Sequence, residues 1–157
     1  MNYSDNAIRL IKKWEGLYLK SYLCPANVAT IGYGTIRYPD GKKVELGQEI
    51  SIQLADSLLR FEMNKIVPKI QELEVNQNQF DSVVSFIYNL GIGAFNKSEL
   101  RKKILANPND LLIRDEWNRW NKHRKDGKLV PSKGLTNRRS DELKLYYLPI
   151  VVTDSKE

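Results

Sequence analysis

The chain is poor in the residues that build disulfides and metal centres. Its 157 residues include one cysteine, Cys24, and one histidine, His123. A single cysteine excludes an internal disulfide, and a metal site rich in cysteine or histidine is excluded as well. A Ser–His–Asp triad would have to use His123, which lies in the polar, basic stretch KHRKDGK and is a poor candidate for that role. We therefore expect no metal and no other cofactor.

Long apolar runs are also missing. No stretch reaches the roughly 18 consecutive apolar residues of a membrane span. The first residues, MNYSDNAIRLIKKWEG, lack the charged start, apolar run and small-residue cleavage site of a signal peptide. We expect a protein that is made and folded in a cytosol, with no transmembrane anchor. A length of 157 residues, 41% of them hydrophobic, suits one domain with a real core.

Positive charge is unevenly spread along the chain. The formal net charge is +6, and residues 97–139 hold 13 Lys or Arg against 5 Asp or Glu. Such a basic surface suits a polyanionic partner, whether nucleic acid, a membrane surface or a bacterial wall. A solvated basic face without any partner is the plainer interpretation. No nucleic-acid motif accompanies the charge, so we expect no nucleic-acid partner.

The pattern of apolar residues predicts an α+β protein that is mostly helical. Residues 4–15 form a short helix that Ser4 or Asp5 caps and Gly16 ends. Residues 17–46 mix β-branched residues, glycines and the turn PDGKK, and are the only convincing β region. The remaining pattern is helical, with a break at Pro68 and a basic loop at 121–134, and predicts helices over 51–66, 76–90, 98–106, 110–121 and 136–148.

These segments predict a two-lobed molecule. A small N-terminal lobe with a β-hairpin covers about residues 1–60, and a helical lobe covers about 61–150. The helix over 51–66 connects them, and a flexible tail occupies about 150–157. A cleft between the lobes is the default place for a site.

The stretch EGLYLKSYLCPANVATIGYG carries the candidate chemistry, because it offers a carboxyl, a thiol and a hydroxyl at Glu15, Cys24 and Thr30. Glu15 falls at the end of an apolar helix stripe, where a carboxylate costs free energy unless it has a partner. A glutamic acid at a cleft can act as a general acid, and a thiol or hydroxyl opposite can hold a water. The plainer alternatives are a salt bridge at a lobe boundary for Glu15 and a buried core thiol for Cys24.

This spacing of Glu15, Cys24 and Thr30, followed by IGYG, resembles the active-site signature of phage-type lysozymes, the endolysin muramidases of glycoside hydrolase family 24. NQNQFDSVVSFIYNLGIGAFNKSEL is similar to the central helix of that family and the turn after it. GLTNRRSDEL is similar to its C-terminal segment. The three motifs occur in the family's order and cover most of residues 8–148.

The resemblance implies a lysozyme-like fold, with residues 1–157 as a single catalytic domain, and a specific chemistry. The enzyme would hydrolyse the β-1,4 bonds between N-acetylmuramic acid and N-acetylglucosamine in bacterial peptidoglycan and so lyse the host cell. Glu15 matches the general acid, and Thr30 matches the threonine that helps to position the attacking water. Arg138 matches the arginine that pairs with the acid. Gly32 and Tyr33 belong to the signature as supporting or substrate-binding residues.

The resemblance also implies a setting. We expect a monomer that accumulates in the host cytoplasm and reaches the wall through holin-type membrane lesions. The basic C-terminal lobe would bind the anionic cell envelope.

Two positions depart from the family pattern. Cys24 stands where the family usually has Asp, so it either orients water with Thr30, giving inversion, or attacks the anomeric carbon as a thiolate, giving retention. We favour the first. Thr35 replaces a His that many members carry, and we expect this to change a local contact but not the chemistry.

Other functions stay open at this point. A lytic transglycosylase needs the acid but no water-positioning partner, and a basic binder of nucleic acid or wall polymer needs no catalysis. A catalytically dead wall-binding relative would follow if Cys24 cannot replace Asp. The tryptophans at 14, 117 and 120 either stack on sugars or pack in the core, and core packing is the stronger expectation.

Overall fold

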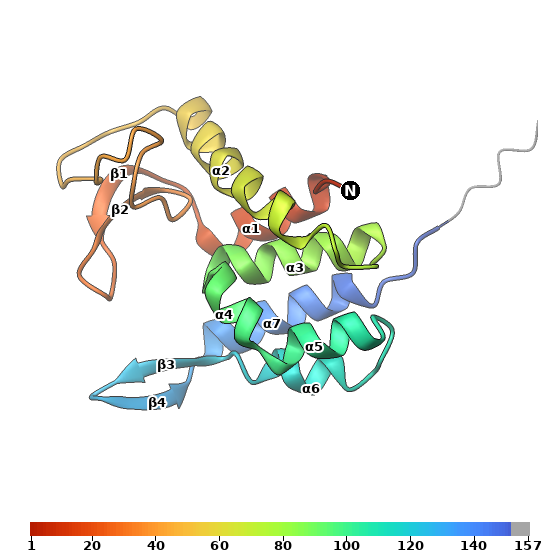
Figure 1. Cartoon of the computed structure of the whole chain (residues 1–157). Helices are drawn as coiled ribbons and strands as arrows, with labels where there is room; N and C mark the ends of the chain where they lie inside the picture. The colour runs from red at the N-terminus through yellow and green to blue at the C-terminus, as the bar shows by residue number, and fades with distance from the viewer. Residues whose placement is uncertain (152–157) are drawn as a thin grey trace, which may run out of the picture.

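A computed structural model describes residues 1–151 of the chain. Within these residues, two small antiparallel hairpins lie on the same side of a body of helices (Figure 1). The architecture is α+β and mostly helical, as the sequence predicts. Most of the expected flexible tail, residues 152–157, lies outside the described residues. No helix in the described part is long and apolar enough to cross a membrane.

The N-terminal elements follow local signals in the sequence. Helix α1 (Asp5–Glu15) begins after Ser4, whose hydroxyl accepts a hydrogen bond from the backbone N–H of Asn6. It ends at Gly16, where φ is +71°. Strands β1 (Tyr18–Leu23) and β2 (Ala29–Gly32) then pair antiparallel. Both the helix and the β region are confirmed.

The chain between β2 and the next helix forms an irregular extension of this hairpin. Arg37 pairs with Lys43 across the PDGKK turn, and Lys20 pairs with Glu49. Helix α2 (Ile52–Ile66) follows, capped by the Ser51 hydroxyl. The 3-10 turn η1 (Val67–Ile70) contains Pro68, which ends the α-helix as predicted. Helix α2 contacts both β2 and α3 and so connects the two parts of the molecule.

Helix α3 (Gln77–Leu90) runs through the centre of the helical lobe. Helices α1, α2, α4 (Ile92–Lys97) and α7 (Lys133–Tyr146) pack against it. Helices α5 (Glu99–Ala106) and α6 (Ile113–Asn118) complete the lobe. Because α1 also contacts α7, it is built into the helical lobe, although the predicted boundary near residue 60 places it in the other lobe.

The prediction that residues 121–134 form a loop is wrong. This segment contains the second hairpin, β3 (Lys122–Lys125) and β4 (Lys128–Pro131). The turn is Asp126–Gly127, where both φ angles are positive, +52° and +75°. Asp-Gly is a preferred pair for such two-residue turns, so the signal was present in the sequence.

Two helix starts and one additional helix also differ from the sequence-based prediction. Helix α6 begins at Ile113, because the Asp110 carboxylate accepts a hydrogen bond from the backbone of Leu112 and holds a turn there. Helix α7 begins at Lys133, one residue after its cap Ser132. Helix α4 was not expected, because Gly91 at φ +89° ends α3 and the chain at once turns into a new helix.

Candidate active site

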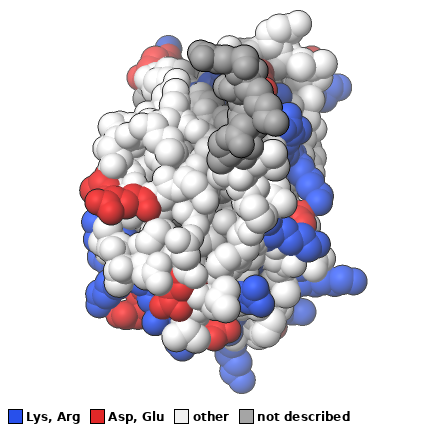
Figure 2. Space-filling view, turned by 90° about the vertical axis from the view of Figure 1, so that its right-hand side faces the viewer, with Lys and Arg blue, Asp and Glu red and all other residues white. Residues whose placement is uncertain are grey.

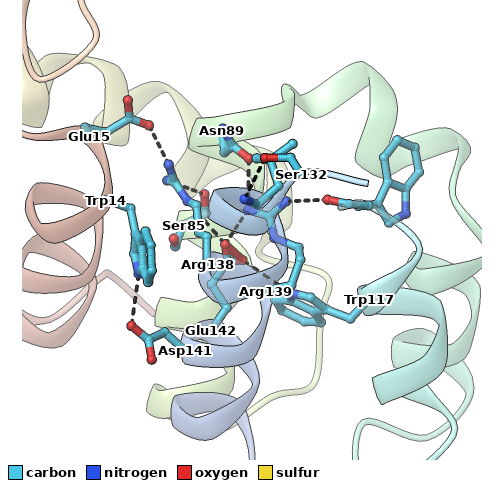
Figure 3. A network of polar contacts seen from close by, with 12 residues as sticks. Trp14, Glu15, Ser85, Asn89, Trp117, Ser132, Arg138, Arg139, Asp141 and Glu142 are labelled. Atoms are coloured by element: carbon cyan, nitrogen blue, oxygen red, sulfur yellow. Dashed lines mark hydrogen bonds and ion pairs between the residues drawn. The ribbon is translucent and has the colours of Figure 1, made fainter. Parts of the chain in front are cut away.

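Glu15 and Arg138 form an ion pair where α1 meets α7 (Figure 3). The Arg138 Nη1 donates to Glu15 Oε1 at 2.7 Å, although the residues are 123 positions apart in the chain. The Arg138 side chain is 4% exposed and the Glu15 side chain 20%. A second guanidinium nitrogen, Nη2, donates to the backbone carbonyl of Ser85 on α3. The carboxylate therefore has the partner that its place on α1 demands.

The missing side chain of a glycine in the hairpin lobe leaves room for the other oxygen of Glu15. Gly34 lies in the loop after β2 at φ +84°, and a Cβ built there would come within 2.9 Å of Glu15 Oε2. No other residue fits this position without moving the carboxylate. The Tyr88 hydroxyl, from α3, donates to the carbonyl of Tyr33 and so ties this loop to the helical lobe. Burial raises the pKa of Tyr88, which keeps that donor protonated.

A cleft runs beside this loop. One cavity of about 420 Å³ lies between the hairpin lobe, α2 and α3, and Gly34, Ile36, Glu62 and Tyr88 are among its lining residues. A second cavity of about 400 Å³ reaches the β1–β2 turn and shares Ile36 and Arg37 with the first. Gly34 lines the first cavity, and Glu15 Oε2 lies where a side chain at position 34 would begin, so the acid lies at the edge of the cleft between the lobes.

Cys24 and Thr30 lie together at the open end of the β1–β2 hairpin. Cys24 is partly exposed, which overturns the alternative of a buried core thiol. Thr30 is 4% exposed, and its hydroxyl donates to the Val28 carbonyl at 2.9 Å. Hydrogen bonding from the backbone of Val28, and then from Ala26 and the Thr30 hydroxyl, lowers the pKa of the Cys24 thiol below its ordinary value. The thiol and the hydroxyl thus share one polar corner.

Two other signature residues serve packing. At Gly32, where φ is +63°, an added Cβ would meet the side chains of Ile50 and Ala55. Tyr33 is 7% exposed and belongs to the hydrophobic core. Neither lines a cavity described above, and both fit the supporting part of the expectation better than substrate contact.

Thr35 lies in the wall of the cleft, at the position where many family members have His. It is 3% exposed, and its hydroxyl has no hydrogen-bond partner within the described residues.

The tryptophans mostly serve the core, as expected. Trp117 is fully buried, and Trp120 packs edge-to-face on Phe86. Trp14 is partly buried, and its indole N–H donates to Asp141.

Glu142 and Arg139 belong to the site, although the sequence does not single them out as functional. Glu142 is fully buried behind Arg138, with its Oε1 3.4 Å from the Arg138 Nε. It also pairs with Arg139 and accepts the indole N–H of Trp117 at 3.2 Å. Its signal was the spacing Arg-Arg-x-x-Glu, which puts all three charges on one side of a helix.

A family model described as Phage lysozyme matches residues 12–142. The chain belongs to the phage lysozyme family. It is therefore a glycoside hydrolase of the lysozyme class, as the resemblance of its motifs predicts. This membership favours a lysozyme over a non-enzymatic basic binder.

Related proteins agree with this assignment. The endolysin of Acyrthosiphon pisum secondary endosymbiont phage 1 is 33% identical over 150 residues, with 93% of this chain and 98% of the relative covered. The endolysin of Bacillus phage PZA is 39% identical over 151 residues, again with 93% of this chain covered. This chain spans 55% of the Bacillus phage protein, slightly over half of its length.

Solved structures show the same fold. The endolysin from Escherichia coli O157:H7 phage FAHEc1 has a TM-score of 0.87 and 38% identity, with 94% of each chain covered. The muramidase domain of SpmX from Asticcacaulis excentricus has a TM-score of 0.82 and 29% identity, covering 94% of this chain and 99% of the other. The lysozyme-like fold predicted from the sequence is confirmed.

Proposed function

We propose that this lysozyme is an endolysin that hydrolyses the β-1,4 bond between N-acetylmuramic acid and N-acetylglucosamine, with Glu15 as its general acid. The observation that supports this role is the Glu15–Arg138 pair at the edge of the cleft. Arg138 fixes one carboxylate oxygen, and the missing side chain at Gly34 leaves the space for the other. A carboxyl group held in this way can give its proton to the leaving glycosidic oxygen with little reorganisation.

On the other face of the sugar, Cys24 and Thr30 position the attacking water. As the C–O bond breaks, the anomeric carbon becomes oxocarbenium-like and is attacked by water. The Thr30 hydroxyl and the Cys24 sulfur hold that water by hydrogen bonds. The water adds hydroxide to the anomeric carbon and releases a proton to solvent through the open corner, and Glu15 takes a new proton from solvent. This assignment predicts inversion of configuration at the anomeric carbon.

A covalent route is the competing mechanism at the same site. The lowered pKa of Cys24 increases the thiolate fraction, and a thiolate can attack the anomeric carbon directly. Inversion is favoured because Thr30 lies beside the thiol, ready to share a water. A glycosyl–Cys24 adduct detected by mass spectrometry would replace the inverting assignment with the retaining one.

The experiment compares the release of new reducing ends from purified peptidoglycan by the wild type, Glu15→Gln and Cys24→Ser. We expect Glu15→Gln to lose at least about 100-fold in rate, because general acids contribute this much or more. Cys24→Ser keeps a hydrogen-bonding group and should keep most of the rate. Full activity of folded Glu15→Gln would remove Glu15 as the acid, and 1,6-anhydro products would indicate a lytic transglycosylase.

The setting of the reaction is part of the proposal. We propose a monomer, because an open cleft must reach an insoluble mesh, that is made in the host cytoplasm and passes through holin-type lesions. The hairpin β3–β4 carries exposed Lys122, Arg124 and Lys125, so it is the element best suited to meet an anionic envelope. The opposite end of the molecule has a largely uncharged middle with acidic and basic groups around it (Figure 2).

A further inference from the structure

We infer that Glu142 is a positioning residue that supplies a second countercharge to Arg138, so that Glu15 can lose and regain its proton in every turnover. The inference rests on the proposed function, in which Glu15 is the general acid. Glu142 itself is fully buried and lies on the far side of Arg138 from Glu15 (Figure 3). It lines none of the cavities described above, so it acts through its neighbours.

Four charged groups make up the cluster. Arg138 and Arg139, neighbours on α7, are 4% and 0% exposed, and both face Glu142. Glu142 Oε1 receives Arg139, while Oε2 receives the indole N–H of Trp117. Arg139 is also held by the side-chain oxygen of Asn89 on α3 at 2.9 Å. Burial raises the pKa of Glu142, and the two arginines and the Trp117 N–H act in the opposite direction. With Glu15 and Glu142 both ionised the cluster is neutral, since two cations face two carboxylates.

The neutral state cannot persist through a catalytic cycle. Before it donates, Glu15 carries a proton and no charge, so Arg138 loses its direct countercharge. A buried guanidinium without a countercharge is strongly unfavourable. Glu142 is then the remaining carboxylate beside Arg138, 3.4 Å from its Nε, and that Nε has no hydrogen bond of its own. Glu142 therefore lowers the cost of the protonated state of Glu15.

The charged and titratable groups that face Glu15 come from several elements. Arg138 and Arg139 lie on α7, Tyr88 on α3 and Tyr22 on β1. The pKa values of both tyrosines are raised, mainly by burial, so both are neutral near neutral pH. The arginines are then the cations whose field favours the ionised form of Glu15, and Glu142 is the group that offsets them.

The test is the pH dependence of kcat for Glu142→Gln, which keeps the shape of the side chain and removes its charge. With two arginines and no buried countercharge, the positive field at Glu15 is stronger in this variant than in the wild type. We expect the alkaline limb of the profile to move down by about 0.5–1 pH unit. At a pH on that limb this is a loss of about threefold to tenfold in kcat, with KM unchanged. Reducing-end release from soluble peptidoglycan fragments gives both constants.

Two further variants separate charge from folding. Arg139→Gln combined with Glu142→Gln removes one cation and one anion, so the net charge beside Glu15 equals that of the wild type. Its alkaline limb should return to the wild-type position. Asp141→Asn is the matched control, because Asp141 is the adjacent carboxylate on α7 but pairs outward with Lys13 and Trp14. Its limb should not move.

Every result bears on the inference. A limb that coincides with the wild type in folded Glu142→Gln, or one that stays displaced in the double variant, overturns it. If Glu142→Gln does not fold, the double variant and Glu142→Asp carry the test, and a displaced limb in either variant overturns the inference. A wild type that releases no reducing ends instead contradicts the proposed function, so the two failures are distinguishable.

Discussion

Replacement of Gly34 by Ala tests how closely the geometry of Glu15 controls the rate. The new Cβ would lie 2.9 Å from Glu15 Oε2, about 0.5 Å inside the 3.4 Å at which ordinary contact begins. The loop is tied to α3 by the Tyr88 hydroxyl, so the carboxylate is the group that gives way. Its displacement strains the hydrogen bond to Arg138 and moves the proton away from the glycosidic oxygen.

The size of the effect follows from this distance. A misplacement of about 1 Å can cost about 100-fold in rate, so one of about 0.5 Å should cost about tenfold. Alanine at φ +84° also strains the backbone by about 1–2 kcal/mol. For a protein of this size that strain lowers the melting temperature by about 2–8 °C.

Gly41→Ala is the control, because it repeats the strain without the contact. Gly41 has φ +86°, and nothing lies within 4 Å of a Cβ built there. We expect both variants to melt at lower temperature than the wild type, while only Gly34→Ala loses activity per folded molecule. Reducing-end release and thermal unfolding are measured on the same samples. Equal activity of the two variants would refute the argument that Gly34 controls the position of Glu15.

The remaining predictions concern the thiol and the basic surface. Because hydrogen bonding from the Val28 backbone lowers the pKa of Cys24, its thiolate persists to lower pH than in a free cysteine. Alkylation by iodoacetamide should therefore rise with pH at a lower midpoint than in a cysteine peptide and should inhibit lysis; full activity after proven modification removes Cys24 from the mechanism. Added salt should reduce lysis of whole walls, and less so for Arg124→Ala with Lys125→Ala in β3, since screening weakens exposed charges; a flat response would contradict envelope binding.

Local signals account for the parts of the fold that the sequence predicts well. Ser4 and Gly16 bound α1, and Ser51 and Pro68 bound α2, because caps and breakers act within a few residues. The hairpin β3–β4 was missed although Asp126–Gly127 is a strong turn signal, since its strands lack the apolar alternation of a buried hairpin. Its polar strands are possible because almost all of their residues face solvent.

The residues of the site also fall into those that the sequence predicts and those that depend on tertiary packing. Glu15 and Arg138 were predicted from motifs whose residues lie far apart in the chain, and the fold brings them together. Glu142 was not, because a charged residue in a charged helix is normally solvated. Its burial depends on the packing of α7 against α3 and α6, which no local pattern contains.

The division of the site between two bodies gives a physical account of how cysteine can stand at position 24. Glu15 belongs to α1, and Arg138 and Glu142 belong to α7, and the ion pairs between these three side chains join only these two helices. Cys24 belongs to the β1–β2 turn, where its backbone N–H donates to the Val28 carbonyl and its own carbonyl accepts from the Asn27 N–H. A change of Asp to Cys at this position therefore leaves the ion pairs of the acid in place, but it removes a negative charge from the same neighbourhood and alters the group that meets the water. The rate of Cys24→Asp, measured beside the wild type as a function of pH, then reports the value of a carboxylate at that position, and the position of the alkaline limb shows whether the new charge also acts on Glu15.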